Sequence, residues 1–312
     1  MKRSILSLGG LCVLLGVVVS AALWIGPSET TRAVLLHIRL PRVLLGLLVG
    51  MALAVAGTIY QGLLRNPLAD PYFLGTSSGA SIGVVLAAAL HLASPLWLYS
   101  FAFLCSLAAI AVVYRIAETH GRVPVQTLIL AGIVVSTFIN ALVFLVFSLF
   151  YRQSFMTLFF LLGTLTEADP LLVKISGVVI PAVIATAWYF ARDLNILSQG
   201  EENARHLGID PERTKRVLFL LASILVGSAV AVSGMIGFVG LMVPHILRLL
   251  LGPDHRELIP GSALGGAVLL VVMDTLARTA ASPVEIPVGV VAALAGTPFF
   301  IYLLKRKKGE VF

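Results

Sequence analysis

Charge is scarce in this sequence, and its scarcity excludes a water-soluble protein. Only 12% of the 312 residues are Asp, Glu, Lys or Arg, whereas 59% are hydrophobic and the mean hydropathy is +1.01. A soluble chain carries about 25% charged residues, because charge has to cover the surface that faces water. The sequence therefore predicts a protein for which lipid is the main solvent.

Cysteine is nearly absent, and the common ATPase signature is missing. Cys12 and Cys105 each lie inside an apolar run, so we predict neither a disulfide framework nor a metal site. The chain has no G-x-x-x-x-G-K-[S/T] phosphate loop. We therefore predict no enzymatic activity and no metal or other cofactor held by this chain.

Basic residues outnumber acidic ones, with 22 Lys and Arg against 15 Asp and Glu and a net charge of +7. They stand singly in loops and at the C-terminal tail rather than as a stripe. That distribution is typical of a membrane surface and not of a phosphate-binding face. We expect membrane lipid as a partner and no nucleic acid.

The long apolar runs predict an all-α, polytopic membrane protein. The first run follows Lys2 and Arg3 and is longer than the 7–15-residue apolar core of a cleavable signal, so we interpret it as a retained helix. Two runs, 77–90 and 238–251, are short enough to be buried or re-entrant instead of spanning. The predicted spans are 4–26, 43–64, 77–90, 96–117, 125–150, 171–191, 214–234, 238–251, 259–280 and 286–304.

The distribution of Lys and Arg favours ten spans. If both short runs cross the membrane, both termini lie in the cytoplasm. Sixteen of the Lys and Arg residues then lie on the cytoplasmic side, and six lie outside. If neither crosses, the two sides carry eleven each. Since cytoplasmic loops are enriched in basic residues, we expect ten spans. A shorter run, 154–165, is expected to dip back as a half-helix on the outer side, and no linker divides the single domain 1–312.

A short helix is expected in the loop after the sixth span, over residues 198–208. Ser198 followed by Glu201 is a capping-box pattern, and Gly208 is a typical helix stop. Asp210 and Pro211 then predict the start of a new helix. From the residues alone, an ordinary loop and a docking element for a partner remain equally open.

Several motifs in order resemble the permease subunits of ATP-binding cassette importers for metal chelates, the FecCD type. The resemblance covers about residues 30–304. The matching stretches are Arg39-Leu-Pro-Arg42, Arg65-Asn-Pro-Leu-Ala-Asp-Pro71, Leu74-Gly-Thr-Ser-Ser-Gly-Ala80, Gly200-Glu201 through Ala204 to Leu207-Gly208, Gly237-Phe-Val-Gly-Leu-Met-Val-Pro-His-Ile-Leu-Arg248, Gly252-Pro-Asp-His-Arg256 and Glu285-Ile-Pro-Val-Gly289 with Pro298.

The resemblance implies an importer subunit that carries an iron–siderophore, haem or vitamin B12 across the cytoplasmic (inner) membrane. It implies a homodimer, two separate ATPase subunits that use ATP and Mg²⁺, and an extracytoplasmic substrate-binding protein. The implied site residues fall into three groups on this sequence. ATPase coupling is expected at Gly200, Glu201, Ala204, Arg205, Leu207 and Gly208; the cytoplasmic gate at Asn66, Leu68, Val125 and Gln126; and the path lining at Ser136, Thr137 and Asn140.

Three arginines predicted on the outer side break the charge rule. Arg39, Arg42 and Arg278 stand at motif positions where the family pairs arginine with glutamates of the binding protein, and a planar guanidinium suits a carboxylate. Anchoring to lipid headgroups is the alternative. Asp274 lies one helical turn before Arg278 and is expected to pair with it.

Two other function classes have weaker support. An ion- or proton-coupled secondary transporter needs ionisable groups near the bilayer centre, and Asp274 is the only deep carboxylate that we expect. An intramembrane enzyme needs a catalytic dyad on facing helices, and no H-E-x-x-H motif is present. Relatives that carry vitamin B12 have small hydroxyl residues where this chain has Val125 and Gln126, so the chemistry of the gate stays open.

Overall fold

The computed structural model describes residues 2–27, 29–92, 94–119, 123–149, 162–166 and 168–308. Every regular element in these ranges is helical. The elements are α1 (Lys2–Trp24), α2 (Arg32–Val34), a π-helical turn (Leu35–Arg39), α3 (Leu40–Leu63), a 3₁₀ turn (Pro71–Leu74), α4 (Thr76–Ala89), α5 (Pro95–Ala117), α6 (Val125–Leu149), α8 (Pro170–Tyr189), α9 (Ala191–Ser198), α10 (Glu201–His206), α11 (Pro211–Ser233), α12 (Val239–Leu251), α13 (His255–Thr279) and α14 (Val288–Lys308).

The predicted spans coincide with apolar helices of the structure. In the described ranges, six helices are long and apolar enough to cross a membrane: those that end at Leu63, Ala117, Val146, Tyr189, Ser233 and Thr279. Four shorter apolar helices match the remaining predicted segments: Leu8–Trp24, Thr76–Ala89, Val239–Leu251 and Val288–Leu303. The all-α, polytopic membrane class is therefore confirmed, while a count of ten crossings stays a prediction. The half-helix expected over 154–165 falls largely outside the described residues.

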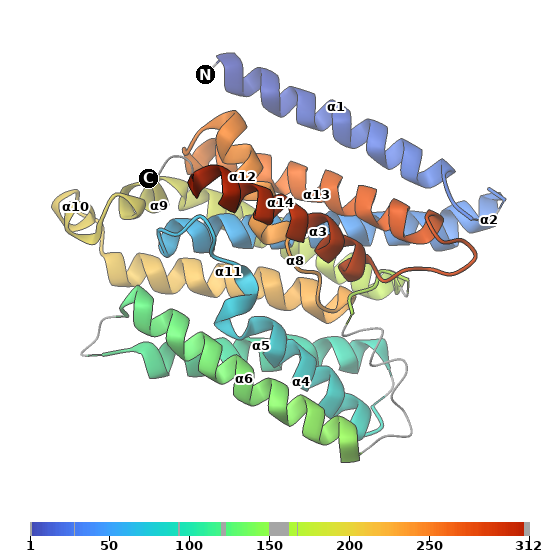
Figure 1. Ribbon diagram of the computed structural model, residues 1–312, viewed down its shortest axis with the longest axis horizontal. Helices are drawn as coiled ribbons and strands as arrows, with labels where there is room; N and C mark the ends of the chain where they lie inside the picture. The colour runs from blue at the N-terminus through green and yellow to red at the C-terminus, as the bar shows by residue number, and fades with distance from the viewer. Residues whose placement is uncertain are drawn as a thin grey trace.

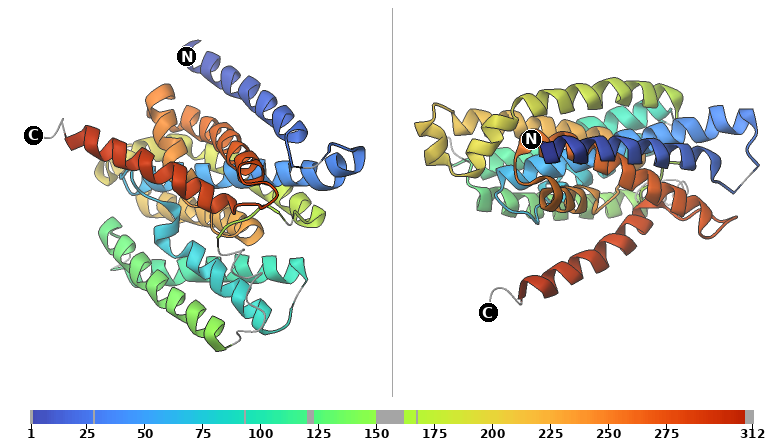
Figure 2. Two further views of the ribbon diagram at one scale, coloured as in Figure 1. Left: turned by 45° about the vertical axis from the view of Figure 1, so that its right-hand side comes forward. Right: turned by 90° about the horizontal axis from the view of Figure 1, so that it is seen from above.

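The helices lie roughly along one axis, which gives the bundle two ends (Figure 1). α9 and α10 lie at one end, here the α10 end, and α2 lies at the other, here the α2 end. α4, α5 and α6 form one side and α1 the opposite side, with α3 between them. α14 diverges from the bundle, most clearly when seen from above (Figure 2). The start of α1 and the end of α14 both lie toward the α10 end.

α3 is the buried centre of the bundle. It contacts α8, α11, α12 and α13, and nearly every residue from Val49 to Leu63 is buried. Its polar side chains have partners on neighbouring helices: Thr58 Oγ1 lies 2.8 Å from Ser262 Oγ, and Tyr60 Oη lies 3.2 Å from Ser223 Oγ. α3 is thus a protein-facing helix despite its apolar composition.

Glycines allow helix backbones to touch at these crossings. A Cβ on Gly50 would collide with the carbonyl of Gly266 on α13, and one on Gly57 with the carbonyl of Gly240 on α12. On the other side of the bundle, a Cβ on Gly79 would lie 2.6 Å from the Cys105 carbonyl of α5. Such small-residue contacts let helices approach closely in lipid, where the hydrophobic effect gives little drive for helix association.

The loop between α8 and α11 differs from the capping box that the sequence predicted. Ser198 ends α9, and its hydroxyl donates to the Asn195 carbonyl at 2.7 Å instead of capping α10. α10 begins after Gly200, which gives it no side-chain cap. The predicted stop and restart are correct: Gly208 has φ +78°, and Asp210 Oδ1 accepts from the backbone amides of Glu212 and Arg213.

Candidate functional site

A cavity of about 540 Å³ lies between α6 and the chain segment that joins α3 to α4. It brings together the predicted gate residues of that segment and the predicted path-lining residues of α6, which are far apart in the sequence. The lining residues are Leu64, Asn66, Leu68, Ala69, Asp70, Tyr72, Leu74, Ile129, Ile133, Ser136, Thr137 and Asn140. The other two predicted gate residues, Val125 and Gln126, lie in the first turn of α6 and do not line this cavity.

Local hydrogen bonds hold the cavity segment in shape. Asn66 Oδ1 accepts from the Leu68 amide at 2.9 Å, and Asp70 Oδ1 accepts from the Tyr72 amide at the same distance. The Tyr72 hydroxyl donates to the Ile236 carbonyl at 2.8 Å and accepts from the Ile236 amide at 3.1 Å. The segment is therefore fastened to the connection between α11 and α12, and its exposed side chains face the cavity from a fixed backbone.

The α6 wall of the cavity combines Ile129 and Ile133 with three polar residues, Ser136, Thr137 and Asn140. The Thr137 hydroxyl donates to the Ile133 carbonyl of its own helix at 2.8 Å. Ser136 Oγ is buried and has no hydrogen-bond partner among the residues that the structure describes, and Asn140 is exposed. The cavity as a whole is lined mainly by apolar side chains with a few polar ones, which suits a large, weakly held solute better than a tightly coordinated ion.

Asp70 is the acidic side chain among the lining residues. Burial raises its pKa to about 6, although the hydrogen bond from the Tyr72 amide acts in the opposite direction. The cavity therefore gains negative charge as the pH rises through about 6.

Residues 75–79 match the letters of the G-x-S-x-G motif of hydrolases. That motif presents its serine on an exposed turn between a strand and a helix. Here a 3₁₀ turn precedes the motif, and Ser77 at its centre is 3% exposed inside the bundle. The geometry is that of packing between α4 and α5, not of a nucleophile.

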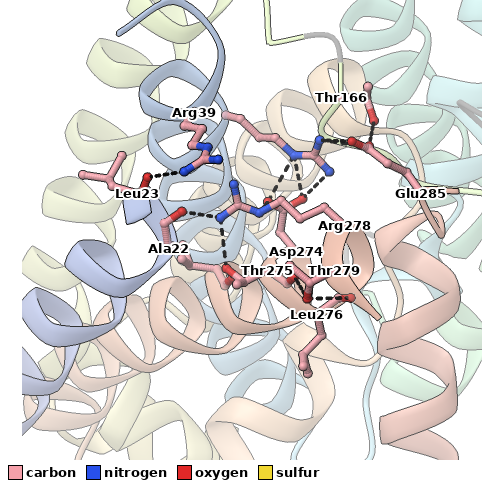
Figure 3. A network of polar contacts seen from close by, with 12 residues as sticks. Ala22, Leu23, Arg39, Thr166, Asp274, Thr275, Leu276, Arg278, Thr279 and Glu285 are labelled. Atoms are coloured by element: carbon pink, nitrogen blue, oxygen red, sulfur yellow. Dashed lines mark hydrogen bonds and ion pairs between the residues drawn. The ribbon is translucent and has the colours of Figure 1, made fainter. Parts of the chain in front are cut away.

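The three predicted docking arginines, Arg39, Arg42 and Arg278, are all buried. Arg39 ends the π-helical turn that follows α2, and Arg42 and Arg278 share the carboxylate of Asp274. Figure 3 shows Arg39 and Arg278 close to each other in this network. Arg42 is 6% exposed and forms ion pairs with Asp274 at 2.9 Å and with Glu285 at 2.9 Å. Arg278 pairs with Asp274 at a longer distance, 3.8 Å. The expected Asp274–Arg278 pair thus exists, but Arg42 is the closer partner of Asp274.

Arg39 and Arg278 also cap the end of α1. Arg39 Nη1 donates to the Leu23 and Trp24 carbonyls at 2.9 and 3.0 Å, and Arg278 Nη2 donates to the Ala22 carbonyl (Figure 3). The last carbonyls of a helix have no partner within it and carry its negative dipole end, so guanidinium groups satisfy both needs. This accounts for the burial of two arginines that the sequence analysis placed at the outer surface or among headgroups.

Glu285 is the accessible member of this arginine cluster. Its side chain is 38% exposed, and it bridges Arg42 and the Thr166 hydroxyl, which donates to it at 3.2 Å. The sequence analysis quoted Glu285 within a motif but gave it no role. An acid placed in a short loop just after an Arg-containing span is the signal that could have identified it.

The predicted coupling residues divide into two faces of α10. Ala204 is fully buried, and Glu201 is turned inward, where its carboxylate accepts from Lys215 of α11 at 3.1 Å. Arg205, Leu207 and Gly208 are exposed at the α10 end. α10 therefore has an inner face that contacts the bundle and an outer face that is exposed. Lys215 is a further residue that the sequence analysis did not single out.

Comparisons with known proteins agree with this architecture. The chain matches the FecCD transport family over residues 6–306. It is 42% identical over 289 residues to the cobalamin import system permease protein BtuC of Halobacterium salinarum, which covers 93% of this chain and 78% of the relative. It is 44% identical over 283 residues to the hemin transport system permease protein HmuU of Yersinia pestis, with 88% of this chain and 84% of the relative covered.

Two solved structures share the fold. A metal-chelate-type ABC transporter in an inward-facing conformation has a TM-score of 0.88 at 30% identity and covers 96% of this chain and 98% of its own. PsaBC from Streptococcus pneumoniae, in complex with Fab, has a TM-score of 0.61 at 19% identity, covers 86% of this chain and 92% of its own, and shows the fold alone. The relatives are transport permeases, and the chain, an integral membrane protein built from the same helices, belongs to the FecCD transport family.

Proposed function

We propose that this chain forms the translocation pathway of an ATP-driven importer for a metal chelate of the cobalamin, haem or iron-chelate type. The observation that carries the proposal is the near full-length match to the FecCD transport family, whose relatives include permeases named for cobalamin, hemin and Fe³⁺ dicitrate. Two copies pair in the inner membrane with their termini in the cytoplasm, and ATP is hydrolysed by two separate subunits.

The cavity beside α6 is one half of the translocation pathway in this proposal. α6 also carries exposed apolar side chains next in sequence to the lining residues: Leu130, Val134 and Phe138 are 63%, 59% and 64% exposed. A second copy facing this side across a two-fold axis would close the pathway. Ser136, Thr137 and Asn140 then line it, with few groups that could hold a rigid chelate back.

The gate at the cytoplasmic mouth combines two sets of residues. Asn66 and Leu68 lie on the segment that the Tyr72–Ile236 contacts fix in place, whereas Val125 and Gln126 begin α6. A movement of the start of α6 relative to that segment would widen or narrow the mouth. This is the alternating access that a transporter requires, with one end closed as the other opens.

The ATPase subunits dock on the exposed face of α10. Arg205 and Leu207 present a charge and a 63% exposed apolar side chain next to Gly208. A short helix that offers an apolar residue beside a charge suits a groove on a partner. Glu201 and Ala204, which face inward, serve to seat this helix.

The binding protein docks at the α2 end, above the cluster of Arg39, Arg42 and Arg278. Three guanidinium groups against the carboxylates of Asp274 and Glu285 leave an excess of positive charge there. Buried charges act on a partner through their field, which mainly changes the association rate.

Removing the exposed acid tests this docking proposal. Reversal of the buried arginines would disturb the fold, so Glu285→Gln is the better variant. It should raise the association rate with the binding protein by about 2-fold to 10-fold at low salt, and the gain should shrink as salt is added. Surface plasmon resonance at two salt concentrations measures both. An unchanged rate at low salt would remove the cluster from docking.

Reconstitution tests the function itself. The chain is placed in proteoliposomes together with the ATPase and the binding protein that the proposal requires, and it is supplied with cyanocobalamin, haemin or ferric dicitrate. ATP-dependent uptake of one chelate, lost when the ATPase is omitted, is the expected result. Uptake that persists without the ATPase and follows a proton or ion gradient would show a secondary transporter instead.

A further inference from the structure

A buried lysine lies between α10 and the start of α6. Lys215, in the second turn of α11, is 3% exposed. Its Nζ atom lies 2.7 Å from Glu212 Oε1, 3.1 Å from Glu201 Oε1 and 3.5 Å from the Val123 carbonyl. One ammonium group therefore contacts α11, α10 and Val123, which lies two residues before the start of α6.

The Val123 contact places Lys215 next to the proposed gate. Val123 is 3% exposed, and the carbonyl of the following residue, Pro124, accepts from the Leu128 amide at 3.0 Å, which begins the hydrogen-bond ladder of α6. Val125 and Gln126 are the next residues along the chain. A shift of the Lys215 ammonium would thus act on the backbone from which these two gate residues extend.

Holding α10 in place does not by itself require a buried charge. Ala204 is fully buried against the bundle, and its carbonyl accepts from the Ile209 amide at 2.9 Å, which closes the end of the helix. Burial of an ammonium group has a large desolvation cost that its ion pairs only roughly offset, and an apolar side chain of the same length would pack at this place at least as well. The charge therefore has another consequence: α10 cannot move away from α11 without giving up the Glu201–Lys215 ion pair, whereas the Glu212–Lys215 pair stays within α11.

We propose that Lys215 is a positioning residue that transmits movement of α10 to the start of α6. This inference rests on the proposed function, in which an ATPase moves α10 and residues 125–126 gate the pathway. When the ATPase displaces α10, Glu201 moves with it, and the charge-assisted hydrogen bond draws the Lys215 ammonium along. The ammonium also contacts the Val123 carbonyl, so the beginning of α6 follows.

The test uses the complete complex in proteoliposomes, with uptake of the chelate that the wild type transports. Lys215→Met keeps the length of the side chain and removes the charge, Lys215→Arg keeps the charge, and Lys174→Met removes an exposed lysine of α8 as a matched control. Three quantities are measured: ATPase recovered with the permease, ATP hydrolysed, and chelate transported per ATP.

Lys215→Met should leave ATPase recovery and hydrolysis within about 2-fold of wild type and lower transport per ATP by about 10-fold, a typical size for coupling between two sites. Lys215→Arg should recover most of the loss, and Lys174→Met should change nothing. Glu201→Gln should uncouple in the same direction, and combining it with Lys215→Met should add little, because both changes remove the same ion pair.

Each other outcome contradicts the inference in a recognisable way. Transport per ATP at the wild-type level in Lys215→Met shows that the lysine transmits nothing. In a second outcome, Lys215→Met loses ATPase recovery and transport in parallel, while Glu201→Gln transports normally. This outcome shows that Lys215 only holds the docking surface. Failure of the wild type to transport in an ATP-dependent way would contradict the proposed function, and this inference with it, and is told apart from the other two outcomes because it is seen without any substitution.

Discussion

At the scale of single residues, Asp70 makes the stability of the protein depend on pH. Its pKa of about 6 in the folded chain exceeds the ordinary carboxyl value, because burial disfavours the charged form. The folded state therefore binds the proton more tightly than the unfolded state, and the stabilising effect of that proton is present below about pH 4 and lost as the pH rises through about 6.

Asp70→Asn should remove this dependence. The amide oxygen can still accept from the Tyr72 amide, but the side chain no longer titrates. We expect the wild-type melting temperature in detergent to fall more between pH 4.5 and pH 6.5 than that of the variant. The difference between the two proteins cancels the titration of other groups, and identical pH profiles would show that Asp70 keeps an ordinary pKa.

Asp274 and Glu285 bind the same arginine but should differ in their effect on stability. Asp274→Asn leaves Arg42 and Arg278 without their buried counter-ion and should lower the free energy of unfolding by about 3–5 kcal/mol. The Glu285 side chain is 38% exposed, so Glu285→Gln should lower the free energy of unfolding by less than about 1 kcal/mol. Thermal unfolding of the two variants in one detergent compares them; equal losses would contradict the ranking.

At the scale of helices, the two faces of α10 should respond differently to substitution. Arg205→Glu and Leu207→Ala change only exposed side chains, so we expect normal thermal stability and at least about a 10-fold loss of affinity for the ATPase, the effect of one central interface residue. Ala204→Leu places a large side chain at a fully buried position and should lower the melting temperature as well. Measurement of ATPase binding and melting temperature for all three separates the outer face from the inner one.

The sequence predicted the helices well and their contacts poorly. Apolar runs long enough to cross lipid are visible without any partner, and each of the predicted spans coincides with a helix. The predicted capping box at Ser198 was wrong because Ser198 is the last residue of α9. The local pattern of residues 191–198 gave no indication of a separate helix. Asp210 and Gly208 were predicted correctly, since their conformations depend on neighbours in the chain.

The candidate site needed information that a single sequence does not hold. Arg39 and Arg278 were assigned to the outer surface because their partners, the carbonyls at the end of α1, belong to the backbone and leave no mark in the sequence. Asn66 as a gate residue and Ser136 as a path-lining residue were both assigned through the family resemblance, and the structure places the two beside the same cavity. The sequence analysis counted Lys215 only among the sixteen basic residues expected on the cytoplasmic side.

At the scale of the assembled transporter, the gate should close between two copies. Cysteines at Asn66 or Leu68, in a chain whose Cys12 and Cys105 are replaced by serine, should form disulfides across the homodimer, and ATP with Mg²⁺ should change the yield by about 5-fold or more. Non-reducing electrophoresis of the complex measures the dimer. A cysteine at Lys174, exposed on α8, is the control and should give no nucleotide-dependent band. If no crosslink forms at either position in any nucleotide state, these residues do not meet at a gate.

The central place of α3 has a consequence for biosynthesis. In the span Arg32–Leu63, 78% of the most apolar stretch is buried by protein, whereas in Val125–Val146, which is about as apolar, only 22% is. In the folded protein α3 faces mainly other helices, so contact with lipid there does not explain why its sequence is so apolar. It emerges from the ribosome before α11, α12 and α13 exist, and it must enter the bilayer alone, where each charged residue at a helix centre costs about 2.5–3.5 kcal/mol. The apolar sequence of α3 thus suits the lipid that surrounds the newly made chain. The glycines at its helix crossings suit the close helix contacts of the folded protein.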